Sequence, residues 1–193
     1  EFLFDRIKTI FDSNQILLAT SDKKSEDPLI EFCNSQKINF FRGSLNNVAK
    51  RMYDAAKNMN AKAFVRISGD SPLIDPSIIL KGVDLYKSGS YDLITNIFPR
   101  SYPIGQSVEI IRTDSLGNIL SNNLTLSEKE HVTKFFYMNH KNFNIINYKL
   151  NTDLSNIRLV VDTQNDFRNI KKIINKMANS HKTFGFKEII ELI

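Results

Sequence analysis

The sequence predicts an α/β fold built on a layered, mostly parallel sheet. Short apolar runs typical of buried strands alternate with amphipathic helical patterns along most of the chain. Strands and helices in this order form a parallel sheet with right-handed crossovers. The 193 residues suffice for one domain with a full core, and no linker divides them, so we expect a single domain over residues 1–193.

The first half of the chain alternates regularly. Pro28 and Pro76 mark helix starts, because a missing N–H in the first helical turn leaves nothing unpaired. Val48 and Met52 fall on one side of a further helix. The expected elements are helix Glu1–Phe11, strand Gln15–Ala19, a helix from Asp27, strand Ile38–Phe41, helix Asn46–Asn58, strand Ala63–Ile67, helix Pro76–Lys87 and strand Tyr91–Thr95.

The alternation breaks after Asn96, and residues 97–150 are expected to form an excursion from the regular fold. Pro99, Pro103 and Gly105 interrupt its first part. The expected elements are strand Gln106–Arg112, helix Thr113–Ser121 capped by Thr113 or Asp114, helix Thr125–Asn139 with a Ser127–Glu130 capping box, strands Phe143–Leu150 and Ile157–Val161, and helices Asn165–Asn179 and Phe186–Ile193.

Composition excludes several classes of protein. The net charge is +5, but Lys and Arg are spread among acidic residues without a basic block, so we expect an anionic small substrate and no nucleic acid. No apolar run approaches the roughly 20 residues of a membrane span. The single cysteine, Cys33, excludes an internal disulfide and indicates a reducing, cytoplasmic setting, where a buried structural thiol is expected.

Two predicted strands lead into aspartates. Ile67 is followed by a Ser-Gly turn and Asp70, and Val161 is followed by Asp162. If both strands are parallel and central, the two carboxylates lie at one edge of the sheet and together suit Mg²⁺. Taken singly, each aspartate is better explained by local structure, Asp70 as a turn residue and Asp162 as a helix N-cap, and only the two together support the metal hypothesis.

The segment Val65–Pro76 (V-R-I-S-G-D-S-P-L-I-D-P) resembles the signature R-x-[ST]-G-D-x-P-L-I-D-P of a known family. The family is the cytidylyltransferase-like proteins of the SpsF type, related to CMP-KDO and CMP-sialic acid synthetases. Further segments resemble family motifs in the same order: Leu18–Asp22 with Glu26–Leu29, Phe40–Ser44 with Val48–Arg51, Glu128–Thr133, and Leu159–Phe167.

This resemblance implies a nucleotide-diphospho-sugar transferase fold. It also implies CTP-dependent transfer to a sugar acid, forming a CMP-sugar for surface polysaccharide biosynthesis with Mg²⁺ assistance. By position, it makes Asp70 and Asp162 catalytic metal ligands. It assigns nucleotide binding to Thr20, Asp22, Arg42, Ser44, Arg51 and Gly69, and sugar binding to Arg66, Gly105, Glu109, Glu130 and His131. Without the resemblance, His131 reads as an ordinary helix histidine.

The sequence departs from the family in two places. The family opens with a central strand and a loop, roughly Q-A-R-M-x-S-x-R-L-P-x-K, that binds the triphosphate, and neither is present here. We therefore expect a sheet lacking its first central strand, a fragment of a longer polypeptide, and little or no transfer by the chain as given. In addition, the family's P-D-G-L-D-V-E reads P-I-G-Q-S-V-E over Pro103–Glu109, with Ile104 and Ser107 at the acidic positions.

Alternatives follow from these departures. One is a non-catalytic nucleotide-binding or scaffold module in polysaccharide assembly, and another is a nucleotidyltransferase of the same fold that uses a different base. The aromatic run Phe135, Phe136 and Tyr137 in the excursion is equally consistent with a homodimer contact and with packing on the chain's own sheet.

Overall fold

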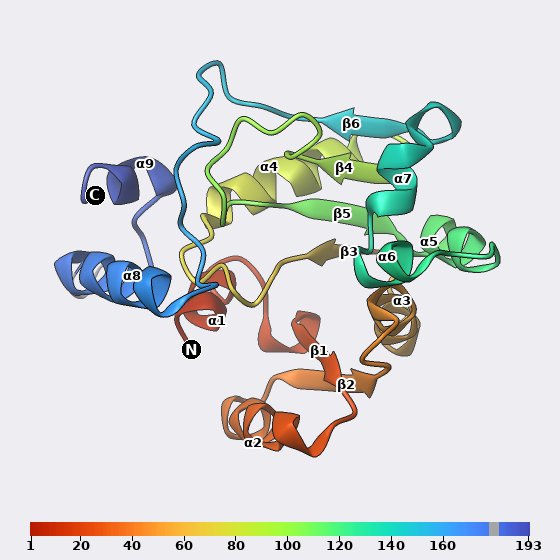
Figure 1. Cartoon of the computed structure of the whole chain (residues 1–193), viewed down its shortest axis with the longest axis horizontal. Helices are drawn as coiled ribbons and strands as arrows, with labels where there is room; N and C mark the ends of the chain where they lie inside the picture. Colours follow the sequence, from red (N-terminus) through yellow and green to blue (C-terminus); the bar gives the residue numbers. More distant parts are fainter. Residues whose placement is uncertain (178–181) are drawn as a thin grey trace. The chain divides into compact units, whose positions relative to one another are not determined.

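A computed structural model of the chain describes residues 1–177 and 182–193 and shows the expected α/β fold (Figure 1). The chain divides into two compact units. Unit 1 consists of Glu1–Ile10, Val65–Ile110 and Ile145–Ile193, and unit 2 of Phe11–Phe64 and Ile111–Asn144.

Unit 2 contains a two-stranded parallel sheet. Strands β1 (Leu17–Ser21) and β2 (Asn39–Gly43) pair in register and are joined through helix α2 (Asp27–Gln36), whose first turn contains Pro28 as expected. Helix α3 (Val48–Asn58) follows and packs against both strands. The short 3-10 helices η1 and η2 cover Ser13–Gln15 and Lys24–Glu26.

A separate sheet has four strands in the order β3-β5-β4-β6 (Figure 1). These strands span Ala63–Arg66 (β3), Glu109–Arg112 (β5), Leu93–Thr95 (β4) and Ile145–Asn147 (β6). The pair β4–β6 is parallel. Arg66 reaches Glu109 at one end of the β3–β5 pair and Lys62 accepts from Thr113 at the other, so these two strands run antiparallel.

Helix α4 (Pro76–Lys87) begins and ends where the sequence predicts. Asp75 is its N-cap and accepts a 2.8 Å hydrogen bond from the amide of Ser77, while Pro76 occupies the first turn. The helix packs against β4. Gly82, on this helix, leaves space for the ring of Tyr148, to whose hydroxyl a β-carbon would approach within 3.0 Å.

A hydrophobic core in unit 1 supports the C-terminal helices. Helices α8 (Gln164–Met177) and α9 (Phe186–Ile190) contribute Ile170, Ile173, Met177 and Ile189, which pack with Leu73 and Leu159. Helix α1 (Phe2–Ile7) places a fully buried arginine, Arg6, whose Nε donates to the carbonyl of Ile74 and whose Nη2 donates to that of Phe184. The core and Arg6 together fix the segment 73–75 and the segment around Leu159.

Several local predictions were wrong in the excursion. The expected helix Thr125–Asn139 is two helices, α6 (Leu126–Glu130) and α7 (Lys134–Met138), because His131 takes an extended conformation at φ −99° and ψ 92°. The capping box uses Thr125 and Glu128 instead of Ser127 and Glu130. Helix α5 (Thr113–Leu120) starts after Arg112 without a side-chain cap, and η3 covers His140–Asn142.

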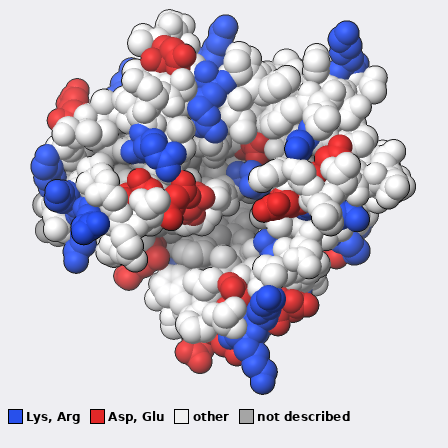
Figure 2. Space-filling view, in the orientation of Figure 1, with Lys and Arg blue, Asp and Glu red and all other residues white. Residues whose placement is uncertain are grey.

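The expected strand Ile157–Val161 makes only one isolated parallel bridge, between Ile104 and Arg158. The expected helix Asn165–Asn179 is found as α8, and its last two predicted residues, 178 and 179, lie outside the described residues. No helix in the described ranges is long and apolar enough to cross a membrane. Lys and Arg side chains lie among Asp and Glu on the face shown in Figure 2, as the sequence indicates.

Candidate active site

Two acidic segments lie side by side in unit 1. The amide of Val161 donates a 2.8 Å hydrogen bond to the carbonyl of Asp70, so the loop after β3 is joined to the residue that precedes Asp162. The Asp70 carboxylate accepts a 2.8 Å hydrogen bond from the hydroxyl of Ser71. The turn residue Gly69 has open space where a β-carbon would stand.

Asp162 belongs to a small charged cluster at the start of α8. Its Oδ2 lies 2.8 Å from Nη2 of Arg158, and the same nitrogen lies 3.7 Å from Oδ2 of Asp166. The Asp166 carboxylate accepts from the amides of Asp162 and Thr163 and from the Thr163 hydroxyl. The bond from that hydroxyl is the main reason that the pKa of the Asp166 carboxyl lies below its ordinary value.

Gly105 allows a close approach of two backbones beside this pair of segments. Ile104 donates to the carbonyl of Ile157 at 2.8 Å and accepts from the amide of Leu159 at 2.7 Å. Gly105 has φ +96°, and a β-carbon there would come within 2.4 Å of the Leu159 carbonyl oxygen. The positive φ and the close backbone contact are therefore sufficient to require a glycine at position 105, independently of any ligand.

Two buried amides that the sequence analysis did not single out fix the segment Pro103–Glu109. The side chain of Gln106 accepts from the amide of Asp75 and donates to the carbonyl of Leu73, both at 2.8 Å. Asn96 donates to the backbone of Gln106 and accepts from that of Val108. Their partners lie 10 to 33 residues away, so no local pattern marks them.

Arg66 and Glu109 form an ion pair at the end of β3 and the start of β5. Nη1 of Arg66 lies 2.6 Å from Oε2 of Glu109, whose side chain is only 1% exposed. Nε of Arg66 is buried and has no hydrogen-bond partner in the described part of the chain. The structure thus places these two predicted sugar-binding residues in direct contact with each other.

The pair Asp70 and Asp162 fits Mg²⁺ by its donor chemistry. Within residues 1–177 and 182–193, no group of three or more His, Cys, Asp or Glu side chains forms a ready metal cage. Mg²⁺ does not need one, since it is usually held by one or two carboxylates with substrate phosphates and water. In the same residues, one carboxylate oxygen of each aspartate accepts no hydrogen bond. These two carboxylate oxygens are therefore available to coordinate a cation.

In unit 2, the predicted nucleotide-binding residues gather at the carboxyl ends of the paired strands β1 and β2. Thr20 and Arg42 are register partners there. The Thr20 hydroxyl donates to Glu26 at 2.7 Å, and Nη1 of Arg42 lies 2.7 Å from Asp27. The amide of Asp22 donates to the carbonyl of Gly43. Arg42 also donates to the carbonyls of Ser21, the last residue of β1, and Lys23, in the loop that follows.

Arg51 extends this group from the first turns of α3. Its Nη1 donates to the carbonyl of Ser44 at 3.1 Å, and the Ser44 hydroxyl accepts from the amide of Asn47. Burial lowers the pKa of the Arg51 guanidinium, and the nearby Glu26 opposes this shift. Nε of Arg51 is buried without a hydrogen-bond partner among the described residues.

Glu130 and His131 lie at the end of α6, and both are exposed. Helix α6 packs on α3, which also contains Arg51. The extended conformation of His131 ends α6, so this residue is not in a helix interior, as an ordinary helix histidine would be.

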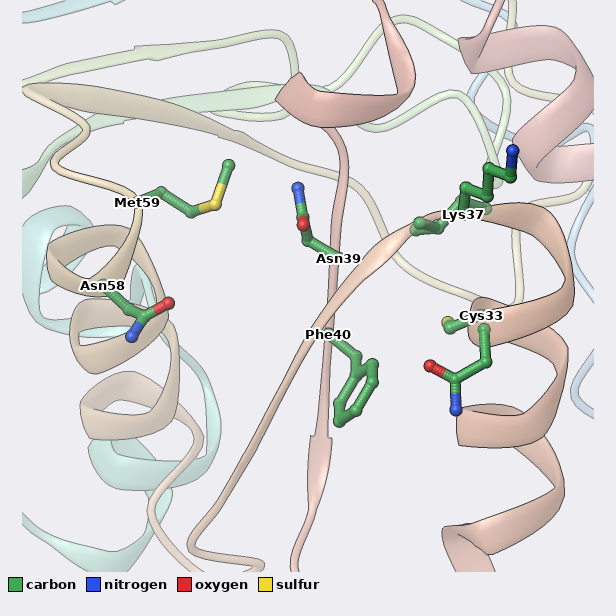
Figure 3. Close-up of a pocket in the computed structure, with 8 residues that line it drawn as sticks. Cys33, Lys37, Asn39, Phe40, Asn58 and Met59 are labelled. Atoms are coloured by element: carbon green, nitrogen blue, oxygen red, sulfur yellow. The ribbon is translucent and has the colours of Figure 1, made fainter.

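A pocket of about 400 Å³ lies elsewhere in unit 2, between the C-terminal ends of α2 and α3 (Figure 3). Its walls include Lys37, Asn39, Phe40 and Met59, and none of the predicted site residues lines it. Cys33 lies beside it and is fully buried, which confirms the prediction of a buried thiol; burial raises its pKa.

Comparison with known proteins agrees with the fold and the motifs. A cytidylyltransferase family model matches residues 1–192. A cytidylyltransferase from Leptospira borgpetersenii is 31% identical and superposes with a TM-score of 0.93 over 100% of this chain and 81% of its own. The spore coat polysaccharide biosynthesis protein SpsF of Bacillus subtilis is 26% identical over 94% of this chain and 75% of its own.

A more distant structure shares the fold alone. CMP:2-keto-3-deoxy-manno-octonic acid synthetase, solved in complex with CTP, is 13% identical and has a TM-score of 0.60 over 89% of this chain and 88% of its own. The layered α/β sheets, the joined acidic segments and the family match over nearly the whole chain lead to one conclusion. This chain belongs to the cytidylyltransferase family.

Proposed function

We propose that this protein catalyses CTP-dependent nucleotidyl transfer to a sugar acid. In this reaction a sugar hydroxyl oxygen bonds to the α-phosphorus of CTP, and the bond from that phosphorus to the bridging oxygen breaks. Pyrophosphate leaves, and the hydroxyl proton is released. The products are a CMP-sugar, pyrophosphate and a proton.

The observation that carries this proposal is the junction between Asp70 and Val161. That 2.8 Å backbone bond keeps two carboxylates, those of Asp70 and Asp162, on neighbouring segments of a chain that belongs to the cytidylyltransferase family. We take both as ligands of Mg²⁺, which would neutralise phosphate charge when bound. The chain's own contribution is to fix the two acidic segments through Gly105, Gln106 and the core beneath them.

Nucleotide binding is proposed for Gly69 and for residues at the ends of β1 and β2. Arg42 and Arg51 supply positive charge there, and the guanidinium of Arg51 also donates to the carbonyl of Ser44. Thr20, Asp22 and Ser44 shape the same loops through their hydrogen bonds. Selectivity for cytosine is part of the proposal.

A sugar acid is the proposed acceptor because related proteins point to that class. The distant synthetase acts on a keto-deoxy sugar acid, and SpsF is named for polysaccharide biosynthesis. Sugar contacts are proposed for Arg66, Gly105, Glu109, Glu130 and His131. With Ile104 and Ser107 in place of acidic residues, a carboxylate on the sugar would meet less repulsion in this segment.

We further propose a cytoplasmic homodimer. The buried, unpaired thiol of Cys33 suits a reducing compartment. In unit 2, Phe136 of the aromatic run is fully buried within the chain, so we propose that a second copy contacts the exposed side chains of Leu126 (80%) and Met138 (65%) instead. Light scattering at micromolar concentration tests the dimer, which a monomeric mass would contradict.

The direct test is pyrophosphate release. CTP, UTP and GTP are each mixed with Mg²⁺ and a panel of sugar acids, with neutral sugars as controls. The 193-residue chain and any longer product of the same reading frame are assayed together. Release that needs both CTP and a sugar acid supports the proposal. CTP binding without release in either form favours the non-catalytic module, and release with another base favours a different nucleotidyltransferase.

A further inference from the structure

We infer that Arg158 is a positioning residue that orients the Asp162 carboxylate for a divalent cation. This inference rests on the proposed function, because it takes Asp162 as a metal ligand. Four observations on Arg158 and its neighbours lead to it.

The first observation is that the backbone of Arg158 is fixed by its neighbours on both sides. Ile157 accepts from Ile104, Leu159 donates to Ile104, and Arg158 itself forms the bridge with Ile104. Two residues further along, Val161 donates to Asp70. The amides of residues 159 and 161 are thus both used by neighbouring segments, which holds this stretch extended between its two anchors.

The second observation is that Arg158 and Asp162 are both exposed and lie on either side of the buried residues Leu159 and Val160. This spacing lets the long Arg158 side chain run along the stretch to Asp162, where the two groups meet at 2.8 Å.

The third observation is that the guanidinium of Arg158 has a second anchor. Asp166 accepts three hydrogen bonds from residues 162 and 163, and its side chain is only 17% exposed. Its Oδ2 lies 3.7 Å from the nitrogen that contacts Asp162. The fixed backbone of Arg158 and the fixed Asp166 carboxylate restrict the position of the Arg158 guanidinium. That guanidinium in turn restricts the orientation of the Asp162 carboxylate.

The fourth observation is that only one oxygen of Asp162 is used. Arg158 contacts Oδ2, and Oδ1 has no hydrogen bond within the described ranges. The side chains of Arg158 and Asp162 are 46% and 53% exposed, so the pair adds little to folding stability. A contact that adds little stability and occupies one carboxylate oxygen, while the other accepts no hydrogen bond, fits an outer residue that orients a metal ligand.

The test measures the affinity of Mn²⁺, used as a Mg²⁺ probe, by electron paramagnetic resonance. Arg158→Ala should weaken Mn²⁺ binding by about 10- to 100-fold, the usual effect of removing an orienting partner. Arg158→Lys should restore part of the affinity, since it can still donate to Oδ2. Arg168→Ala removes an exposed positive charge from α8 and should bind as wild type. Thermal unfolding confirms that all variants fold.

Other results distinguish a failure of the inference on Arg158 from a failure of the proposed function. Tighter binding by Arg158→Ala would show that Arg158 competes with the cation, and unchanged binding would show no role; either overturns this inference. The proposed function is checked by Asp162→Asn in the same assay. If Asp162→Asn loses binding while Arg158→Ala does not, only the inference fails. If wild type binds no Mn²⁺, or Asp162→Asn binds as wild type, the metal site and the inference both fail.

Discussion

The amide of Val161 donates a 2.8 Å hydrogen bond to the carbonyl of Asp70. This single backbone contact joins the loop after β3 to the stretch that precedes α8. It places Asp70 and Asp162 on adjacent segments, although they lie 92 positions apart in the sequence. The proposed chemistry depends on how firmly this junction is held.

Gly105→Ala should destabilise the protein by roughly 2–4 kcal/mol. The position combines φ +96° with a β-carbon contact of 2.4 Å to the Leu159 carbonyl, so both strain and a backbone clash oppose any side chain. Urea unfolding measures the change. Gly69→Ala is the matched control, because open space surrounds its β-carbon position, and its midpoint should stay near that of wild type. Equal midpoints for the two variants would refute the close-approach explanation.

Asp75→Ala should cost about 2–4 kcal/mol, because it removes an N-cap and leaves a buried N–H unpaired. Oδ1 of Asp75 accepts from the amide of Ser77, and Oδ2 accepts from that of Phe186. Asn47→Ala removes a cap alone, on α3, and should cost about 1 kcal/mol. Chemical denaturation compares the two. If Asp75→Ala costs no more than Asn47→Ala, the hydrogen bond from the Phe186 amide to Asp75 does not add to stability as predicted.

Tyr148→Phe should lower stability at pH 7 by about 1–2 kcal/mol, because the hydroxyl donates a buried 3.0 Å bond to the Ile78 carbonyl. Burial, with a smaller effect of Tyr102, raises the pKa of Tyr148 well above its ordinary value near 10. The unfolded chain therefore loses this proton first, and the stability that it supplies is complete below pH 10 and declines above it. Denaturation curves of wild type and variant should converge between pH 10 and 11, whereas a constant gap would contradict the assignment.

Local signals predicted the parts of the fold that local chemistry determines. The start of helix α4 was predicted to the residue because Pro76 marks it, and the structure adds Asp75 as the N-cap. The helix that continues through His131 was predicted wrongly, since residues 125–139 have suitable helical periodicity and nothing in that pattern requires the extended conformation. The Thr125–Glu128 box was within reach of sequence reasoning, because it follows the same spacing rule as the one expected a turn later.

The candidate site, like the fold, could be predicted from the sequence only in part. The sequence predicted Asp70 and Asp162 at the ends of two parallel, central strands. That premise was wrong, because β3 lies at the edge of its sheet and residues 157–161 form an isolated bridge; the backbone bond from Val161 to Asp70 joins the two segments instead. The roles of Gln106 and Asn96 could not be predicted, because each depends on partners that only tertiary folding supplies. The contact between Arg66 and Glu109 was missed for the same reason, although both residues were singled out.

The measurement that tests the central claim most directly is the effect of Mg²⁺ on CTP binding. Calorimetric titration compares wild type, Asp70→Asn and Asp162→Asn, each with Mg²⁺ and with a chelator. Asp84→Asn, at an exposed position of α4, is the control for loss of charge. The account predicts that Mg²⁺ strengthens CTP binding about tenfold or more in wild type and Asp84→Asn, and that either site variant loses most of this gain. An undiminished Mg²⁺ effect in Asp70→Asn and Asp162→Asn would contradict it.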